Sequence, residues 1–384
     1  MSQEAAPPAV PTRRGMRRTL APQVGPGTDV GSYVVDARLG TGGCGTVFRA
    51  QRGGQLYALK FLPLREVGHS GLREVLALSR VSHPNVVGLH GFWQWPDTQA
   101  HCLVVVMEYV EGLRLEEWTR AQNPSALVAL RWVLGVARAL EAVHAAGLLH
   151  LDVKEANIIV RQSDGEAVLV GFGVSVAQSS SSDSGEGLLP GTPRYRSPEA
   201  WRFVREHKVP GLERYRPGPG DDLYALGLVL YWVLTGRMPF SPEDDEGVEA
   251  VLHGVLVPPH EHNPRVPREL SALCEQLLNR RPEARPAASA VCQMLEELLT
   301  QKGEHWEQPL CEAFSVHPST PRPGLGRGQK PSSRRRATAV AVLGLLAVVA
   351  GYLGWARSEA SVSTPSKPPQ AVRFSLVTPE ARTP

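Results

Sequence analysis

The chain has 384 residues, of which 42% are hydrophobic and 21% charged, as is ordinary for a folded protein. This composition excludes a fully disordered chain, a collagen and a polytopic membrane protein, and the length allows one large or two medium domains. Lys and Arg number 41 against 38 Asp and Glu, so no strong field indicates nucleic acid as a partner. The five cysteines are scattered without a C-x-x-C motif, which argues against a disulfide framework or a cysteine zinc site.

Residues 1–31 are rich in proline and arginine and contain no apolar stretch, so we expect a disordered basic tail and no signal peptide. Strand-like runs follow at 33–35, 46–48, 56–61, 85–93 and 101–109, with one helical pattern at 72–79. After Gly112 the pattern is mainly helical. Ser125 is a plausible N-cap of a helix ending near Gly147, and more helices are predicted at 222–234, 272–278 and 291–299. The order predicts an α+β fold with a β-rich lobe at 32–110 and an α-rich lobe at 111–300.

The C-terminal part predicts a membrane anchor. Residues 301–336 read as a linker, and 337–356 are 20 residues without a charge, long enough to cross a bilayer as a helix. Arg334, Arg335 and Arg336 precede this stretch, so the positive-inside rule places 1–336 in the cytoplasm and a short tail, 357–384, outside. We therefore expect a single-pass protein of the cytoplasmic (inner) membrane. Ala347 and Gly351 form a small-xxx-small pair, a pattern found where such helices pair into a homodimer.

A glycine-rich motif and a lone lysine indicate a phosphate ligand. The motif runs from Gly40 to Gly45, and its glycines let backbone amides approach phosphate oxygens closely. Dinucleotide-binding folds share such a motif, but they place it between a strand and a helix, whereas here strand-like runs flank it on both sides. Lys60 is the single charge in an apolar run, so it needs an acidic partner or a phosphate. Glu74, in the following helical pattern, is the natural partner.

Further polar motifs follow in a fixed order. They are His150 to Asn157, Gly171-Phe172-Gly173, Gly191 to Glu199, Asp222 to Gly227, and Arg285-Pro286. In this order and spacing they resemble the eukaryotic-like protein kinase family, in its bacterial membrane-anchored Ser/Thr form. The resemblance covers about residues 33 to 300 and implies a two-lobed kinase fold that binds ATP and protein substrates.

The resemblance also assigns roles to single residues. Lys60 would hold the α- and β-phosphates and pair with Glu74, Asp152 would be the catalytic base, and Lys154 would lie near the transferred phosphate. Asn157 would be a magnesium ligand. The residues implied to contact the nucleotide are Leu39, Gly40, Gly42, Gly45, Val47, Ala58, Lys60, Met107, Glu108 and Val110. Structural roles are implied for Thr192 in the substrate loop, for a buried Glu199–Arg285 ion pair, and for Asp222 beneath the catalytic loop.

Two residues depart from the family pattern. Leu151 replaces the arginine of the H-R-D motif, so phosphorylation of the serines at 179–182 and 184 has no obvious docking partner. Gly171 replaces the aspartate of the D-F-G motif, which is the principal magnesium ligand, and Asn157 alone is a poor magnesium site. The nearby acids Glu155 and Asp164 match no known ligand position.

The sequence thus supports two hypotheses. The first is a Ser/Thr protein kinase that uses ATP with Mg²⁺ or Mn²⁺ and has reduced activity; Lys60, Glu74, Asp152, Lys154 and Asn157 favour it. The second is a pseudokinase that binds nucleotide and acts as a signalling scaffold, and Gly171 favours it.

Overall fold

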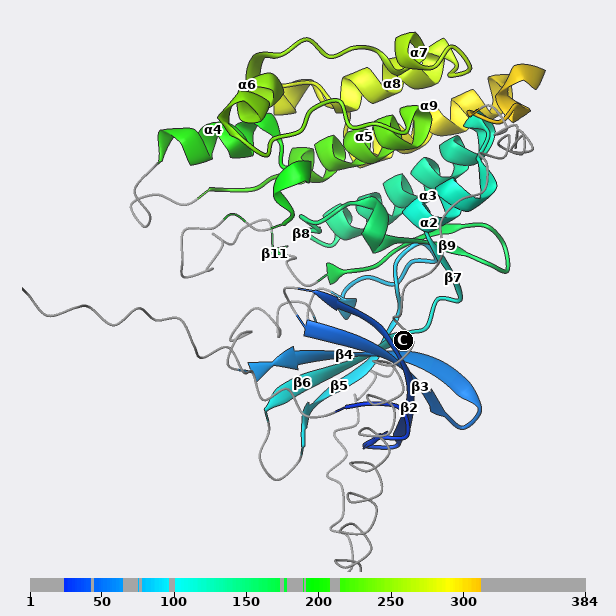
Figure 1. Ribbon diagram of the computed structural model, residues 1–384, viewed down its shortest axis with the longest axis vertical. Coiled ribbons are helices and arrows are strands. Elements are labelled where there is room, and N and C mark those ends of the chain that lie inside the picture. Colours follow the sequence, from blue (N-terminus) through cyan, green and yellow to red (C-terminus); the bar gives the residue numbers. More distant parts are fainter. Residues whose placement is uncertain are drawn as a thin grey trace, which may run out of the picture. The chain divides into compact units, whose positions relative to one another are not determined.

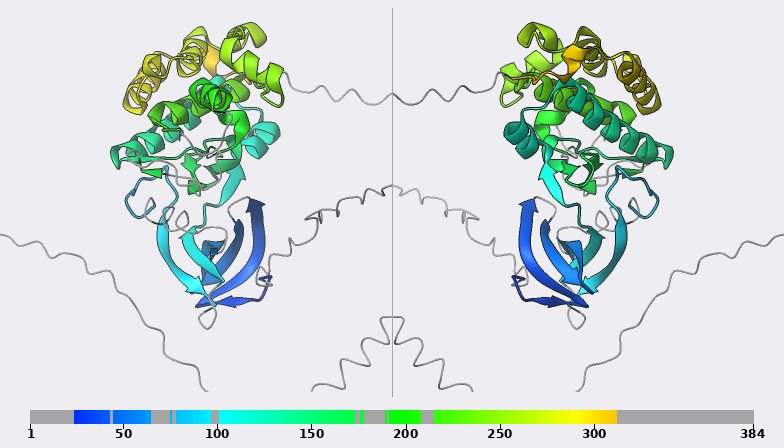
Figure 2. Two further views of the ribbon diagram at one scale, coloured as in Figure 1. Left: turned by 90° about the vertical axis from the view of Figure 1, so that its left-hand side faces the viewer. Right: turned by 90° about the vertical axis from the view of Figure 1, so that its right-hand side faces the viewer.

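The computed structural model describes residues 24–42, 45–64, 75, 78–96, 101–172, 176–177, 189, 191–207 and 215–311. These residues form a strand-rich lobe followed in the chain by a helical lobe (Figure 1). The side views in Figure 2 show the sheet of the first lobe at one end and the helices of the second at the other. The predicted two-lobed α+β organisation is therefore present.

The N-terminal lobe is built on one antiparallel sheet of six strands in the order β1-β2-β3-β4-β6-β5. The strands are β1 (Asp29–Val30), β2 (Tyr33–Gly42), β3 (Gly45–Arg52), β4 (Gln55–Pro63), β5 (Leu89–Trp95) and β6 (Cys102–Glu108). In β6, Val104 and Val106 pack into a cluster within the lobe, whereas Val105 and Met107 belong to the large core shared with the helical lobe. Because neighbouring side chains of a strand point to opposite faces, burial on both faces explains why β6 is a continuous apolar run.

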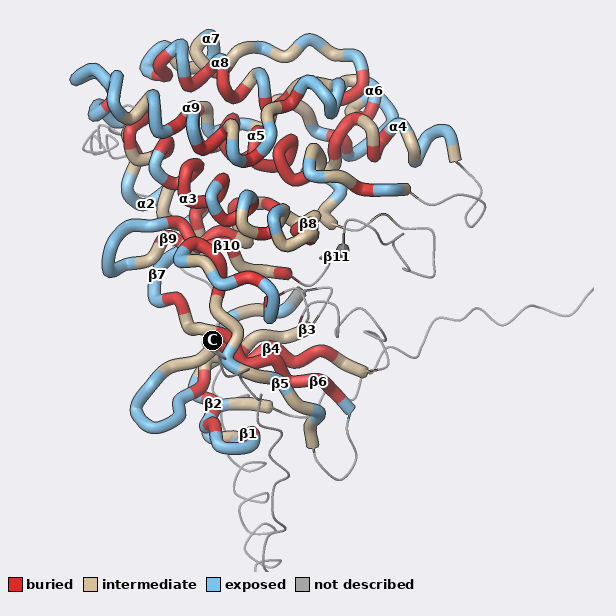
Figure 3. The backbone as a smooth tube through the Cα atoms, turned by 180° about the vertical axis from the view of Figure 1, so that it is seen from behind, coloured by how far each residue is buried: buried red, intermediate tan, exposed pale blue. Residues whose placement is uncertain are grey.

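The C-terminal lobe is mainly helical. Its helices are α2 (Leu115–Gln122), α3 (Ala126–Ala145), α4 (Pro198–Glu206), α5 (Pro219–Thr235), α6 (Asp245–His253), α7 (Pro259–His262), α8 (Arg268–Leu277) and α9 (Ala288–Gln301). Its short strands are β7 (Gly112–Arg114), β8 (Leu148–Leu149), β9 (Ile158–Arg161), β10 (Ala167–Leu169) and β11 (Val176–Ala177), and its 3₁₀ turns are η1 (Glu155–Asn157), η3 (Pro193–Tyr195), η4 (Pro282–Ala284) and η5 (Glu304–Glu307). Helix α5 is buried along most of its length and packs against α3 and α8. Figure 3 shows this burial concentrated in the central helices and the middle strands.

Most of the predicted elements are present. The strand-like runs at 33–35, 46–48, 56–61 and 101–109 correspond to β2, β3, β4 and β6, and the three later helices to α5, α8 and α9. Ser125 caps α3 as expected, since its Oγ accepts a hydrogen bond of 3.3 Å from the amide of Val128. The predicted strand at 85–93 begins only at Leu89, because Val86 instead forms an isolated parallel bridge with Leu169 of the other lobe. The helical pattern at 72–79 lies mostly outside the described residues.

The packed part of the chain extends beyond the predicted limits of 32 and 300. Val30 is fully buried in the N-terminal lobe, and Trp306 and Leu310 are each 3% exposed against the helical lobe. The amide of Leu310 donates to the carbonyl of Pro124 at 2.9 Å. Two isolated apolar residues among polar ones give no periodic pattern, so the sequence alone does not reveal this packing. The stretch 337–356 lies outside the described residues, and none of the helices that the structure describes is long and apolar enough to cross a membrane.

Candidate active site

Asp222 holds the backbone of the loop that carries the predicted catalytic residues. Its carboxylate, at the start of α5, accepts hydrogen bonds from the amides of His150 at 2.9 Å and Leu151 at 2.7 Å, and it lies 2.9 Å from Nε2 of His144. Leu151 has a φ of +61°, a conformation that non-glycine residues adopt rarely. Two hydrogen bonds to a buried carboxylate stabilise this strained turn. The role expected for Asp222 matches this geometry.

His150 and Phe172 anchor the two ends of the loop region in the core. Nδ1 of His150 accepts a hydrogen bond of 3.2 Å from the amide of Asp152, so its Nε2 donates to the carbonyl of Val170 at 3.0 Å. The ring packs edge-on against Phe172 with centroids 4.7 Å apart, and Phe172 is 1% exposed. Burial lowers the pKa of His150, which keeps the imidazole neutral and fixes this pattern of donor and acceptor.

The carboxylate of Asp152 is surrounded by hydrogen-bond donors. Oδ1 accepts from Oγ1 of Thr192 at 2.7 Å and from its amide at 3.1 Å. Oδ2 accepts from Nδ2 of Asn157 at 2.8 Å and lies 2.8 Å from Nζ of Lys154. Since a carboxylate offers about four acceptor positions, these four contacts fill them, and a substrate hydroxyl must displace one donor to reach Asp152.

Lys154 and Thr192 complete this network. Nζ of Lys154 donates to Oγ1 of Thr192 at 2.7 Å, and that hydroxyl in turn donates a hydrogen bond to Oδ1 of Asp152 at 2.7 Å. The structure therefore brings together Asp152, Lys154, Asn157 and Thr192, as the resemblance implies. These residues come from the catalytic loop and from the segment 191–197, which lies about 40 positions later in the chain.

Gly171 lies directly against the amide side chain of Asn157. The glycine has a φ of +86°, and a Cβ atom added to it would lie 2.6 Å from Cγ of Asn157, 2.7 Å from Oδ1 and 2.8 Å from Nδ2. Real Cβ atoms do not approach other atoms so closely. A side chain at position 171 therefore requires a shift of Asn157 or of the backbone.

The donor set around Gly171 does not fit a resident magnesium ion. Magnesium needs near-octahedral oxygen ligands, normally including carboxylates. In the part of the chain that the structure describes, no three acidic, histidine or cysteine side chains form such a cluster. Nδ2 of Asn157 donates to Asp152, so Oδ1 is the one atom of this side chain that could bind a metal ion, and it carries no charge. The magnesium role expected for Asn157 is thus not supported by a second ligand.

The two other acids considered for this role are engaged elsewhere. Glu155 is buried and accepts a hydrogen bond from the hydroxyl of Tyr195, and burial raises the pKa of its carboxyl. Asp164 lies 3.1 Å from Arg161 on the surface. The Tyr195–Glu155 contact was not predicted. It ties the segment 191–197 to the catalytic loop, and no spacing in the sequence reveals it.

The residues expected to contact nucleotide lie on adjacent strands. Val47 of β3 is opposite Lys60 of β4, and Ala58 of β4 is opposite Met107 of β6. Ala58, Lys60, Met107 and Val110 are buried, whereas Leu39 is 39% exposed at the edge. The carboxylate of Glu108 accepts from the amide of Gly88 at 3.2 Å, and the amide of Glu108 donates to the carbonyl of Gly88 at 2.8 Å.

The glycine motif includes the end of β2 and the first residue of β3. Gly42 and Gly45 are the last paired residues of the hairpin, and Gly45 has a φ of +132°. A Cβ atom there would lie 2.1 Å from the carbonyl oxygen of Phe61, so only glycine fits. Residues 43 and 44 lie outside the described residues, and so does Glu74, so the expected pair of Lys60 and Glu74 remains a prediction.

Arg114 is a cation near the glycine motif that the sequence analysis missed. Its Nη2 lies 3.2 Å from the position of a Cβ atom on Gly40. Arg114 ends β7, and Gly40 lies in β2, so the contact joins the two lobes. The sequence does not predict this contact, because a single arginine near a glycine is common on protein surfaces.

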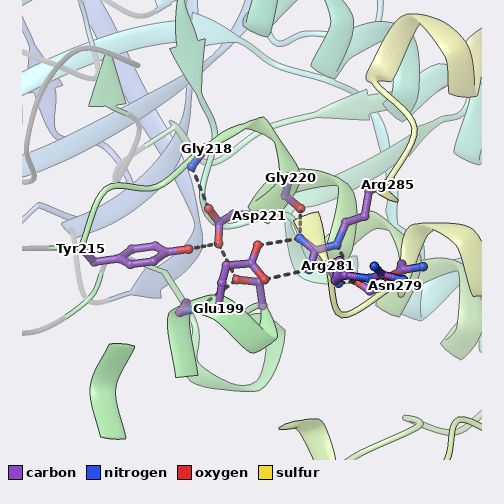
Figure 4. A network of polar contacts seen from close by, with 10 residues as sticks. Glu199, Tyr215, Gly218, Gly220, Asp221, Asn279, Arg281 and Arg285 are labelled. Atoms are coloured by element: carbon purple, nitrogen blue, oxygen red, sulfur yellow. Dashed lines mark hydrogen bonds and ion pairs between the residues drawn. The ribbon is translucent and has the colours of Figure 1, made fainter. Parts of the chain in front are cut away.

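Glu199 and Arg285 form the predicted ion pair. Nη1 and Nη2 of Arg285 lie 2.6 and 2.7 Å from the two carboxylate oxygens, and the arginine side chain is fully buried. Its Nε and Nη1 also donate to the carbonyls of Asn279 and Gly220. Figure 4 shows this fork between Glu199 and Arg285 beside a second network around Asp221. The pair joins α4, at the end of the substrate-side segment, to the body of the helical lobe.

Asp221 is the centre of that second network. Its carboxylate accepts from the hydroxyls of Ser197 at 2.6 Å and Tyr215 at 2.8 Å, and from the amide of Gly218 at 2.8 Å. Burial, together with the nearby charge of Glu199, raises the pKa of Asp221 to about 6. The two adjacent aspartates of α5 therefore differ: Asp221 supports the 191–197 segment, and Asp222 supports the catalytic loop.

The two-lobed fold and the network around Asp152 define the class of protein kinases. Comparison with known proteins gives the same class. Residues 33–295 match the family model described as the protein kinase domain. The chain belongs to the protein kinase family.

Several bacterial proteins are similar to this chain. It is 33% identical over 280 residues to the serine/threonine-protein kinase pkn3 of Myxococcus xanthus, covering 67% of this chain and 48% of that protein. It is 29% identical over 298 residues to the serine/threonine-protein kinase PkaA of Streptomyces coelicolor, covering 72% and 52%. It is 33% identical over 267 residues to the serine/threonine-protein kinase PknE of Mycobacterium tuberculosis, covering 67% and 44%. The chain thus spans about half the length of the curated relatives it matches.

Proposed function

We propose that this chain is a Ser/Thr protein kinase of reduced activity. The network of Asp152, Lys154 and Thr192 carries this proposal, because it holds a carboxylate, a cation and the hydroxyl of the substrate-side segment in direct contact with one another. The names of pkn3, PkaA and PknE support serine and threonine as the acceptors. ATP is the proposed phosphate donor, with Lys60 and the glycine motif as its contacts.

The chemistry would proceed by direct transfer. The acceptor hydroxyl displaces one donor of Asp152, and its oxygen attacks the γ-phosphorus. The new O–P bond forms as the bond to the β,γ-bridging oxygen breaks and ADP leaves. Asp152 receives the hydroxyl proton, and the charge of Lys154 stabilises the oxygens of the transferred group. Because the described residues do not form a magnesium site, part of the usual charge neutralisation is missing, which is the reason for reduced activity.

The experiment is transfer of labelled γ-phosphate from ATP to a generic Ser/Thr protein substrate by the purified full-length chain. We expect slow transfer that Asp152→Asn lowers to background. Equal rates for wild type and Asp152→Asn would contradict the proposal.

The second candidate function is a pseudokinase that acts as a nucleotide-binding scaffold. The contact between Gly171 and Asn157 favours it, because the space for a D-F-G aspartate is filled. ATP binding without transfer above the Asp152→Asn background would select this function.

We further propose that the chain is anchored in the cytoplasmic membrane by residues 337–356, with residues 1–336 inside. The basis is the uncharged stretch and the three arginines before it. A reporter that is active only outside the cytoplasm should be active when fused after Pro384 and silent when fused at residue 330. The opposite pattern would overturn this topology.

A further inference from the structure

Arg196 lines a cavity beside the proposed catalytic base. The cavity lies between the catalytic loop, the segment 191–197 and the start of α5, and its walls include Leu151, Leu189, Thr192, Arg196, Asp221 and Asp222. Thr192 connects it to Asp152, since its hydroxyl donates to Oδ1 at 2.7 Å. A group bound in the cavity would therefore lie next to a hydroxyl held at Asp152.

The guanidinium of Arg196 is poorly satisfied. Its Nη2 donates to the carbonyl of Leu189 at 3.1 Å, and within the described residues its buried Nε has no hydrogen-bond partner. The guanidinium lies over the ring of Trp201, 5.3 Å from the centroid, and the indole Nε1 of Trp201 is likewise buried without a partner. A guanidinium has five N–H donors and a fixed charge, so burial without a counter-ion is costly.

Three described acids of the helical lobe have partners other than this cation. Glu199 is engaged with Arg285, Asp221 with Ser197 and Tyr215, and Glu155 with Tyr195. No salt bridge to Arg196 is formed within the part of the chain that the structure describes. Burial lowers the pKa of Arg196, as expected where no carboxylate compensates for lost solvent.

We propose that Arg196 binds an acidic side chain of the protein substrate, carried by a residue that adjoins the phosphate-accepting Ser or Thr. The inference rests on the proposed kinase function and adds a sequence preference to it. Residues of an extended peptide follow each other at about 3.3 Å, so a neighbour of the acceptor reaches the cavity next to Asp152. A carboxylate accepts paired hydrogen bonds from the fork of a guanidinium. An apolar side chain offers no acceptor to the guanidinium, and a lysine would be repelled.

The test scans a glutamate through the two positions on either side of the acceptor in an otherwise neutral serine peptide, with glutamine as the uncharged match. The full-length chain transfers labelled phosphate from ATP to each peptide. We expect kcat/KM to be about tenfold higher for glutamate than for glutamine at one of the two positions adjoining the serine. Equal rates for the two peptides at both adjoining positions would overturn the inference.

Variants locate the preference on Arg196. Arg196→Gln should remove the difference between the two peptides, and Arg196→Glu should create a preference for lysine at the same position. The matched control is Arg194→Gln, which removes an exposed arginine two residues away and should keep the glutamate preference. A preference that survives in folded Arg196→Gln would overturn the assignment. If either Arg196 variant fails to fold, the wild-type scan and the other variant decide.

Peptide binding separates this inference from the proposed function. Fluorescence anisotropy with labelled peptides that carry Ala in place of the acceptor needs no phosphate transfer. Tighter binding of the glutamate peptide, lost in Arg196→Gln, would support the site even if no transfer occurs. Transfer without any glutamate preference would overturn the site and leave the kinase function standing. No transfer and no charge-dependent binding would overturn both.

Discussion

The amide of Asn157 occupies the space that a side chain at Gly171 would need, with Cγ only 2.6 Å from a Cβ atom at that position. Gly171 also has a φ of +86°, which side chains disfavour. In this arrangement an aspartate fits only if the amide end of Asn157 or the backbone shifts. The glycine at position 171 and the position of Asn157 therefore form one structural feature.

This feature predicts the outcome of restoring the aspartate. Gly171→Asp should lower the free energy of unfolding by about 1–3 kcal/mol, because a side chain is strained at this φ and also displaces Asn157 or the backbone. Gly171→Ala is the matched control, since it adds the same Cβ atom without a carboxylate. We expect similar losses in both, measured by chemical denaturation. If Gly171→Asp also raises magnesium-dependent phosphate transfer while Gly171→Ala does not, Asn157 can move aside and the site can be rebuilt. A Gly171→Ala variant as stable as wild type would contradict the steric argument.

The Glu199–Arg285 pair predicts a large effect of a small chemical change. Glu199→Gln leaves the fully buried guanidinium without its counter-ion, so we expect a loss of about 3–5 kcal/mol in unfolding free energy. Asp36→Asn makes the same acid-to-amide change in the exposed pair of Asp36 with Arg49, where a far smaller loss is expected because solvent screens the two charges. Denaturant unfolding of both variants measures the contrast. Similar losses in the two would show that burial does not strengthen the first pair.

Asp221 predicts a pH dependence of stability. Its pKa is about 6 in the folded chain against an ordinary 3.8, so between these values the folded state binds more protons than the unfolded state. Stability from this group is therefore greatest below pH 4 and is lost as the pH rises through 6, by on the order of 3 kcal/mol.

Comparison with Asp221→Asn isolates this contribution, because other titrating groups such as His150 are present in both proteins. Relative to the variant, wild type should lose unfolding free energy between pH 4 and pH 7. The measurement is denaturant unfolding at each pH. A difference that is constant across this range would refute a raised pKa for Asp221.

The sequence predicted the contacts whose partners belong to motifs with fixed order. Asp222, Glu199 and Arg285 fall in such motifs. Asp222 holds the backbone of the catalytic loop, and Glu199 pairs with Arg285, as expected. Arg114 and Arg196 were not predicted. Their importance depends on which surfaces close around them, and a single arginine in a sequence does not carry that information. The same holds for Tyr195 and Glu155, which meet only because the segment 191–197 folds back over the catalytic loop.

Lys60 predicts a selective loss of nucleotide binding. It is 8% exposed and lies opposite Val47 and Val105 on the neighbouring strands, so its side chain is held within the sheet. ATP should raise the melting temperature of wild type, because a ligand that binds only the folded state stabilises it. Lys60→Met keeps the volume and removes the charge, and the ATP-induced rise should largely disappear. Arg38→Met, which removes an exposed charge from the same sheet, should keep the rise. A full rise in Lys60→Met would contradict a phosphate contact.

Thr192 predicts an effect on the rate of transfer without an effect on nucleotide binding. Its hydroxyl accepts from Lys154 and donates to Asp152, both at 2.7 Å, so it fixes the distance between the proposed base and the cation. Thr192→Val keeps the shape and the backbone amide but removes both contacts. We expect kcat to fall about 10- to 100-fold, as for other losses of positioning near a reacting group, with the KM for ATP unchanged. Thr192→Ser restores the hydroxyl and should recover most of the rate. Steady-state kinetics of the two variants, beside thermal unfolding to show that both fold, distinguish this positioning role from a general loss of structure. If Thr192→Val transfers phosphate as fast as wild type, the hydroxyl does not organise Asp152 and Lys154 during the reaction.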